Sequence, residues 1–327
     1  MTTEKVNDEK IEDDGATEQP TDNLVTTTHT ISGPGWELEY ETITGTMVIN
    51  EELVEDEKFA GPKPKAEVFV ASYVAKGGDG ERPVLFAFNG GPGSSSVWLH
   101  LGLFGPRRVL AGDVDDPRTA PYGLADNAET LLRYADLVFI DPMTTGYTRA
   151  VVGGKPAEYH GYTRDRDLVG EVIRIWLGRH QRWLSPKFLA GESYGTTRAA
   201  SLAGHLVTRH GIALNGIILI SAVLDFGTVR FTHGNDLPYV HFLPTYAATA
   251  AYHQGLSTGE VEERIGRSRT FCHRGPRPSA GKGIAAVGRR AARAREWPVG
   301  TDRVGSRLHR TCPVPDRAQA LLRRTVA

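Results

Sequence analysis

Cysteine is nearly absent from this chain of 327 residues, since only Cys272 and Cys312 are present and both lie near the C-terminus. Residues 1–271 therefore cannot contain a disulfide, which argues against the class of disulfide-dense secreted domains. The sequence also lacks a run of about 18 apolar residues, the length that a membrane-spanning helix needs. Its N-terminus has no basic start followed by an apolar core, as a secretory signal would. From these absences we expect a cytoplasmic protein without a membrane partner.

Large apolar residues are scarce in the first 30 positions. Two lysines, Lys5 and Lys10, stand against eight acidic residues: Glu4, Asp8, Glu9, Glu12, Asp13, Asp14, Glu18 and Asp22. A segment of this composition cannot bury enough apolar surface to offset the entropy that it loses on ordering. We therefore predict that residues 1–30 form a disordered acidic tail.

Acids and leucine are scarce in the last part of the chain. Residues 265–327 contain 14 arginines against three acids, and no leucine occurs between Arg267 and Arg307. The apolar residues there stand singly and follow neither a strand nor a helix period. We predict that residues 266–327 form a disordered, arginine-rich tail. One explanation is that the coding frame changes near Ile265, because a GC-rich gene read in a wrong frame yields such a composition; the neighbouring DNA frames would test this.

The formal net charge of −1 gives no general attraction to nucleic acid. The arginines of the tail lack the interleaved aromatic residues that bind nucleic-acid bases, so they support only nonspecific affinity for polyanions. Four residues could be offered as zinc ligands, but their spacing matches neither C-x-x-C nor H-x-x-x-H: Cys272, His273, His309 and Cys312. We predict no metal, no cofactor and no specific nucleic-acid partner.

Between the two tails, short apolar runs alternate with longer helical patterns, which is typical of a mostly parallel sheet covered by helices. We predict one α/β domain over residues 31–265, which includes the start of a cap segment. The expected strands are residues 36–43, 45–50, 66–75, 83–91, 136–141, 187–193 and 214–225, and the expected helices are residues 95–105, 162–183 and 196–209.

A serine stands between two glycines in the sequence GESYG, residues 191–195, where a predicted strand meets a predicted helix. A tight strand-to-helix turn lifts the serine hydroxyl out of the sheet, and glycines on either side remove Cβ atoms that would crowd it. The pattern alone is equally compatible with an ordinary turn serine. In this context it makes Ser193 a candidate nucleophile.

A glycine-rich turn, FNGGPGSSS at residues 88–96, follows an earlier predicted strand. Adjacent glycines let backbone N–H groups turn toward a bound group, and a helix that starts just afterwards adds its positive end. An oxyanion hole for acyl transfer is built in this way. The alternative is a plain Gly-Pro turn, but an α/β-hydrolase places its oxyanion loop at this position relative to the nucleophile strand.

Four motifs, NGGPGSSS, GLFGPRRV, DLVFIDPMTTGYTRA and GESYG, resemble in order and spacing those of the serine carboxypeptidases. These α/β-hydrolase enzymes remove C-terminal residues from peptides, and the resemblance covers about residues 36–265. It implies that Ser193 is the nucleophile and that the backbone N–H groups of Gly91 and Tyr194 form the oxyanion hole. Asn89 and Glu192 would bind the terminal carboxylate of a peptide or protein. Glu192 must then be protonated, so the resemblance implies a preference for acidic pH.

Two residues depart from the family pattern. Ser94 stands where many relatives have a disulfide-forming cysteine, which fits a bacterial-type intracellular form. Leu103 stands where relatives often have a second glutamate that binds the carboxylate. This second departure favours an alternative function as an esterase or acyltransferase of the same fold.

The acid and the base of a Ser-His-Asp triad have no counterpart in the sequence motifs. The family marks them with a Gly-Asp after an apolar strand and a Gly-His turn before a proline, and the chain contains neither. The histidines that could substitute (His205, His210, His241 and His253) lack the turn context that a triad requires. Asp225 ends the last predicted strand, a site that some α/β-hydrolases use for the acid, but the same geometric criterion disfavours it. We therefore expect an incomplete α/β-hydrolase without its C-terminal strands and with little or no activity. A non-catalytic pseudoenzyme is the further alternative.

Overall fold

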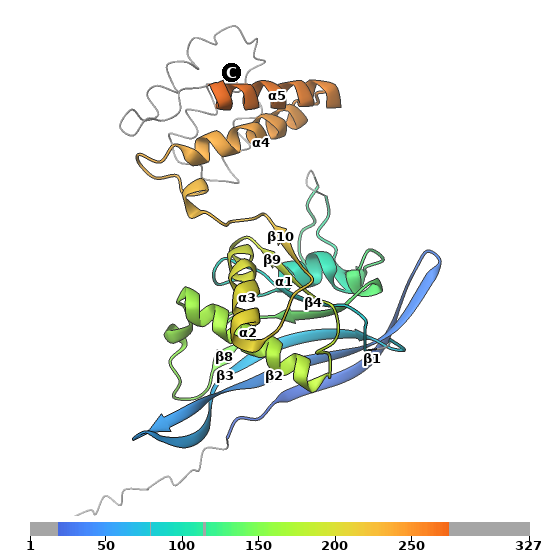
Figure 1. Ribbon diagram of the computed structural model, residues 1–327. Coiled ribbons are helices and arrows are strands. Elements are labelled where there is room, and N and C mark those ends of the chain that lie inside the picture. The colour runs from blue at the N-terminus through green and yellow to red at the C-terminus, as the bar shows by residue number, and fades with distance from the viewer. Residues whose placement is uncertain (1–18, 79, 114–115, 275–327) are drawn as a thin grey trace, which may run out of the picture. The chain divides into compact units, whose positions relative to one another are not determined.

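The computed structural model describes residues 19–274, apart from residues 79 and 114–115 (Figure 1). The chain divides into two compact units, Met1–Ala222 and Val223–Ala327. In the described part of the chain, no helix is both long enough and apolar enough to cross a membrane.

A mixed sheet forms the centre of the first unit. Its strand order is β1-β2-β3-β7-β4-β9-β10, and β8 (Arg149–Ala150) pairs with β3 outside this path. Four strands run parallel to one another: β7 (Asp136–Ile140), β4 (Val84–Phe88), β9 (Lys187–Glu192) and, at the edge of the described sheet, β10 (Gly216–Ile220). Every residue of β4 and β7 is buried, as expected for apolar strands that are covered on both faces. The predicted parallel sheet is therefore confirmed.

Long antiparallel strands extend the sheet on one side: β1 (Asn23–Gly33), β2 (Trp36–Glu55) and β3 (Lys58–Ala75). Because β1 begins at Asn23, the predicted tail boundary at residue 30 is wrong. The segment has few large apolar residues because β1 is an edge strand; its three consecutive threonines favour extended backbone, and Ile31 alone of its residues is fully buried. Residues 1–18 lie outside the described residues.

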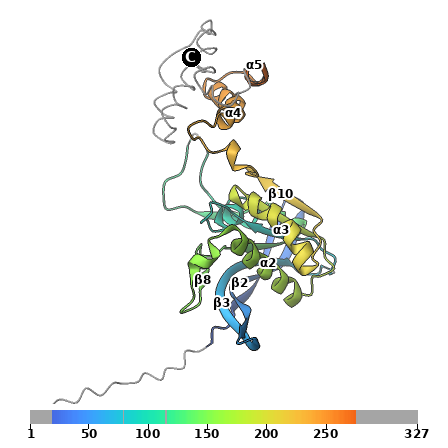
Figure 2. The same ribbon diagram turned by 60° about the vertical axis from the view of Figure 1, so that its left-hand side comes forward.

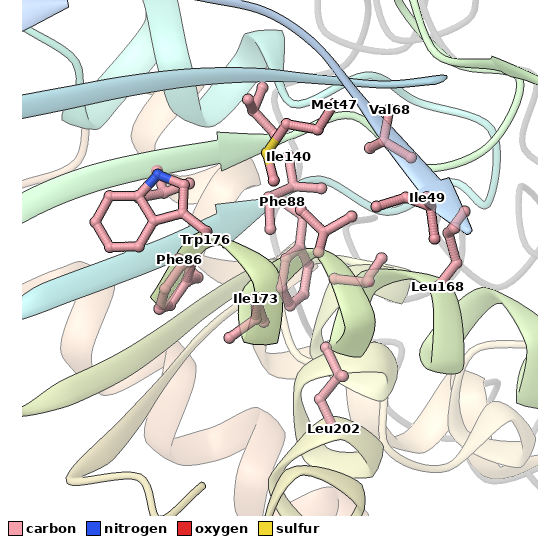
Figure 3. Packing of buried hydrophobic residues seen from close by; sticks show 14 of the residues in the cluster. Met47, Ile49, Val68, Phe86, Phe88, Ile140, Leu168, Ile173, Trp176 and Leu202 are labelled. Carbon is pink, nitrogen blue, oxygen red and sulfur yellow. The ribbon is translucent and has the colours of Figure 1, made fainter. Parts of the chain in front are cut away.

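Successive side chains of the inner strands point to opposite faces of the sheet and belong to two apolar clusters, one on each face. Phe86 and Phe88 of β4 belong to the cluster that packs against α2 (Tyr162–Arg179) and α3 (Tyr194–His210), as Figure 3 shows. The edge of the Phe86 ring meets Trp176 at a centroid distance of 5.4 Å. Figures 1 and 2 show α2 and α3 side by side on this face.

The opposite face of the sheet carries the second cluster, which includes Leu85 and Phe139. The helix predicted over residues 95–105 begins there as a short α1 (Val97–Leu99) and continues as a π-helix, η1 (His100–Phe104). Smaller elements follow: β5 (Arg107–Val109), β6 (Leu124–Asp126), η2 (Leu131–Arg133) and η3 (Pro156–Tyr159).

The described part of the second unit contains η4 (Phe226–Thr228), α4 (Leu237–His253) and α5 (Thr258–Arg274). At the start of α5, Glu260 Oε2 accepts hydrogen bonds from the backbone N–H and the hydroxyl of Ser257, at 2.9 and 2.6 Å, and the first of these is the glutamate half of a capping box. The helix then runs through Ile265, so regular structure extends past the predicted boundary at residue 266. Residues 275–327, and with them most of the predicted arginine-rich tail, lie outside the described residues.

Candidate active site

Ser193 lies in the turn between β9 and α3, with φ 57° and ψ −124°. A positive φ is costly for a residue with a Cβ, and such residues cluster at active sites. The backbone fixes the turn: the Ser193 N–H donates to the carbonyl of Ile220 at 2.9 Å, and its carbonyl accepts from the N–H of Thr196 at 2.9 Å. The turn is thus pinned to β10 on one side and to the first turn of α3 on the other.

Glycines allow the backbones around this turn to touch. A Cβ added to Gly191 would lie 2.1 Å from the carbonyl oxygen of Gly195, and one added to Gly90 would lie 2.4 Å from the backbone nitrogen of Tyr194. Both distances are too short for any side chain. The glycine-rich loop after β4 therefore packs directly on the turn, and Gly91 follows in that loop with φ 105°.

Asn89 joins the loop to the turn through its side chain. It is fully buried, and its Nδ2 donates to Glu192 Oε2 at 3.1 Å. Its Oδ1 accepts from the N–H of Leu99 at 3.0 Å, which fixes which end of the amide faces Glu192. The structure thus brings together all five residues that the sequence predicted for the site: Asn89, Gly91, Glu192, Ser193 and Tyr194.

A buried ion pair that contacts the glycine-rich loop was not predicted from the sequence. Arg198 of α3 is 1% exposed; its Nε donates to Asp165 Oδ2 at 2.8 Å and its Nη2 to Asp165 Oδ1 at 3.1 Å. Its Nη1 donates to the carbonyl of Asn89 at 2.7 Å. A signal was present, because each charge lies a helical turn from a core leucine, Leu202 in α3 and Leu168 in α2.

Tyr194 belongs to the same cluster. The guanidinium of Arg198 lies over its ring, 5.2 Å from the centroid. Burial raises the pKa of the Tyr194 hydroxyl, and the negative charge of Asp165, to which the hydroxyl is hydrogen-bonded, raises that pKa further. The phenol therefore stays protonated and donates to the Asp165 carboxylate.

Behind the loop, His100 of η1 pairs with Tyr73 of β3. The Tyr73 hydroxyl and His100 Nε2 are 2.5 Å apart. Burial lowers the pKa of His100 to about 4 and raises the pKa of Tyr73. A neutral imidazole is thus hydrogen-bonded to a protonated phenol, and this bond ties η1 to the sheet.

The candidate triad partners lie with other groups. His205 Nδ1 is 3.5 Å from Asp167 Oδ1, and the His210 ring meets the His205 ring at 5.2 Å, toward the C-terminal end of α3 and away from Ser193. Burial lowers the pKa of both imidazoles. His241 and His253 of α4, and Asp225, which caps η4 by accepting from the N–H of Gly227 at 2.8 Å, belong to the second unit.

In the residues that the structure describes, no group of three or more His, Cys, Asp or Glu side chains is placed to hold a metal ion. Of the zinc ligands weighed from the sequence, the Cys272 thiol donates to the carbonyl of Val240 at 3.2 Å, while His309 and Cys312 lie outside the described residues.

Comparison with known proteins decides the family. The family model described as serine carboxypeptidase matches residues 60–250, more than half of the chain. The chain belongs to the serine carboxypeptidase family. The match spans the glycine-rich loop, the turn at Ser193 and the strands that carry them, which here form the sheet of an α/β-hydrolase.

Among the relatives in this family are two serine carboxypeptidase-like proteins of Arabidopsis thaliana. Serine carboxypeptidase-like 3 is 24% identical over 64% of this chain and 45% of its own length. Serine carboxypeptidase-like 4 is 27% identical over 72% of this chain and 49% of its own length. The chain therefore spans about half the length of the curated relatives it matches.

Solved structures with some similarity include the peroxisomal alpha-beta-hydrolase Lpx1 from Saccharomyces cerevisiae. It has 14% sequence identity and a TM-score of 0.31, over 63% of this chain and 45% of that one. Brefeldin A esterase, described as a bacterial homologue of human hormone sensitive lipase, has 17% identity and a TM-score of 0.32, over 60% of this chain and 44% of that one.

Proposed function

We propose that this protein has the site of a serine-type carboxypeptidase, which recognises the C-terminus of a peptide or protein and forms an acyl-enzyme on Ser193. The observation that carries the proposal is the junction of two motifs. The strained turn at Ser193 lies directly beside Glu192, and Glu192 is hydrogen-bonded to Asn89 of the glycine-rich loop. A nucleophile and a candidate carboxylate-binding pair thus share one corner of the sheet.

The chemistry assigned to these residues is acyl transfer. Ser193 Oγ attacks the carbonyl carbon of the last peptide bond, and the backbone N–H groups of Gly91 and Tyr194 stabilise the oxyanion that develops. The terminal amino acid leaves with a proton, and water then hydrolyses the acyl-enzyme. Asn89 Nδ2 donates to the substrate carboxylate, and Glu192 does so when a proton is shared between the two carboxyl groups.

We propose further that this chain turns over slowly or not at all. The Gly-Asp and Gly-His motifs of the family are not in the sequence, and His205 and His210 of the first unit lie with Asp167. A serine nucleophile without its acid and base retains only binding and oxyanion stabilisation, which leaves roughly a thousandth or less of the full rate. If no turnover remains, the protein is a pseudoenzyme that binds C-termini without cleaving them.

One observation favours a second candidate function, that of an esterase or acyltransferase. The side chain of Leu103, at the position where relatives often have a second acid, is apolar and 48% exposed. An apolar group there offers nothing to a terminal carboxylate. The alternative therefore predicts that binding does not depend on a free C-terminus.

Binding of a peptide with a free C-terminus and of its C-terminal amide, measured by calorimetry, separates these functions without requiring turnover. We expect the free acid to bind more tightly than the amide, and more tightly at about pH 5 than at about pH 8, because two carboxyl groups need a shared proton. In Glu192→Gln, the side-chain amide of the glutamine can donate at any pH, so the affinity for the free acid should depend less on pH. Equal affinity for acid and amide would overturn carboxylate recognition and support the esterase alternative.

A further inference from the structure

We infer that Arg198 is a positioning residue that holds the two halves of the oxyanion hole in register. The inference rests on the proposed function, because it concerns the same site. Its basis is that one buried guanidinium contacts both segments from which the oxyanion donors come: the main chain of the loop at Asn89, and the side chain of Tyr194 in the turn.

On the loop side, Arg198 Nη1 donates to the carbonyl of Asn89 at 2.7 Å. Strand β4 ends at Phe88, so this carbonyl lies just beyond the ladder and is buried with its residue. A buried carbonyl needs a donor. Arg198 supplies it, whereas the N–H of Leu99 donates to the Asn89 side chain. The main chain of Asn89 is thus held by Arg198, and its side chain by the N–H of Leu99.

On the turn side, the guanidinium acts through Tyr194. It lies over the Tyr194 ring and, 5.4 Å from the centroid, over the Phe88 ring of β4. Asp165 completes the link, because its carboxylate takes a bidentate hydrogen bond from Arg198 and another from the Tyr194 hydroxyl. Bidentate pairing fixes the plane of the guanidinium, which a lysine could not do.

The close packing makes this clamp sensitive to small displacements. A Cβ on Gly90 would lie 2.4 Å from the Tyr194 nitrogen, and one on Gly195 would lie 2.7 Å from the Phe88 carbonyl oxygen. The loop and the turn therefore have one closely packed arrangement. Loss of the guanidinium frees the Asn89–Gly90 peptide plane to rotate, and the adjoining peptide unit, which carries the N–H of Gly91, shifts as a result. A misplacement of about 1 Å at such a site costs about 100-fold in rate.

The test compares Arg198→Met with a matched control, Arg174→Met, whose arginine pairs with Glu171 on α2 and is 43% exposed. Two quantities are measured on the full chain: the rate at which a fluorophosphonate labels Ser193, and amide hydrogen exchange of residues 89–94. We expect Arg198→Met to lower the labelling rate about 100-fold and to raise exchange in residues 89–94 relative to the core strands. The control should change neither quantity.

A second variant separates positioning from stability. Removal of one partner from a buried ion pair destabilises a fold strongly, but replacement of both by apolar residues is often neutral. Asp165→Leu combined with Arg198→Met should therefore regain the thermal midpoint of unfolding while labelling stays slow and residues 89–94 stay fast in exchange. If the double variant recovers labelling together with stability, Arg198 is only structural and the inference is overturned.

The failure of the proposed function has a different signature. If the unaltered chain is not labelled, the nucleophile proposal fails, and the exchange data alone decide the role of Arg198. Exchange in residues 89–94 that is equal in Arg198→Met and Arg174→Met, or that rises uniformly through the first unit, contradicts the positioning role. A selective rise confined to residues 89–94 in both the single and the double variant supports it.

Discussion

At the residue scale, Gly90 shows how little room the site leaves. A methyl group there would lie within 2.6 Å of three backbone atoms of the turn: the nitrogens of Tyr194 and Gly195 and the carbonyl oxygen of Glu192. None of these atoms is the end of a flexible side chain. The loop can therefore accept a larger residue only by withdrawing from Ser193.

Gly90→Ala should accordingly lower the free energy of unfolding by about 1–3 kcal/mol, the usual cost of overpacking. Chemical denaturation measures this change. The control is Gly204→Ala in the middle of α3, where a Cβ meets nothing within 4 Å. This substitution should stabilise the protein by up to about 1 kcal/mol, since alanine favours helix over glycine. Equal effects of the two substitutions would contradict the described packing.

The residues of the site differ in how far the sequence could predict them. Ser193 and the glycine-rich loop lie in short contiguous motifs whose chemistry depends on local backbone shape, so the sequence was sufficient. Arg198 and Asp165 were missed because their role depends on the packing of α3 against α2, far apart in sequence. A charged residue on an apolar helical face is a signal that more often marks a partly exposed side chain than a buried pair.

At the element scale, two buried polar contacts join neighbouring elements around the sheet, one a hydrogen bond and the other a set of ion pairs. One is the pair of Tyr73 in β3 and His100 in η1. The π-helical turn places the imidazole against the Phe139 ring, with 4.5 Å between centroids, where it is neutral. No periodicity of the sequence distinguishes a π-helix from the α-helix predicted over residues 95–105, because the change from i→i+4 to i→i+5 hydrogen bonds is set by packing on the sheet.

The low pKa of His100 makes stability depend on pH. The unfolded chain binds a proton at this imidazole below about pH 6.5, whereas the folded chain does so only below about pH 4, so the contribution is present above pH 6.5 and lost as the pH falls through 4. Between about pH 7 and about pH 4, His100 should account for a loss of about 3 kcal/mol in the free energy of unfolding. Denaturant titrations of wild type and His100→Gln measure it. Identical pH profiles would refute the burial of a neutral imidazole.

The second contact is made by Asp136 at the start of β7. The carboxylate is fully buried and accepts from Arg82 Nε at 2.8 Å, from the N–H of Ala75 in β3 at 3.0 Å, and from Arg182 Nη1. It thus joins β7 to the end of β3 and to the segment after α2. The position was predicted only as the first residue of a strand, because its partners are distant in sequence.

Asp136→Asn removes the charge from this junction and leaves two arginines without their counter-ion. The free energy of unfolding should fall by about 3–5 kcal/mol, as is typical when one partner of a buried ion pair is removed. Glu171→Gln is the control, because its partner Arg174 is 43% exposed and such pairs contribute at most about 1 kcal/mol. Thermal or chemical unfolding of both variants provides the comparison. A small effect at Asp136 would mean that solvent reaches this junction.

At the scale of the whole molecule, the sequence predicted the parallel sheet and the family but not the division of the chain. Strands that are covered on both faces appear in the sequence as continuous apolar runs, and over residues 66–225 such runs alternate with helical patterns. The order of apolar residues therefore predicts the sheet directly. The separation at Ala222 was not predicted, because α4 is as apolar as a helix that covers the sheet and so suggests a continuation of the same domain. Polar edge strands such as β1 were likewise mistaken for a tail.

Reactivity of Ser193 in the unaltered chain tests the central claim most directly. A fluorophosphonate should label the protein slowly, because the acid and base motifs of the family are not in the sequence, but should reach one-to-one stoichiometry on long exposure. Ser193→Ala should remove the label, and turnover of peptide should remain at the residual level of a nucleophile without its acid and base. Mass spectrometry of the intact chain and of its proteolytic peptides gives the stoichiometry and the site. Labelling that persists in Ser193→Ala, or none in the folded wild-type chain, would contradict the assignment of Ser193 as the nucleophile.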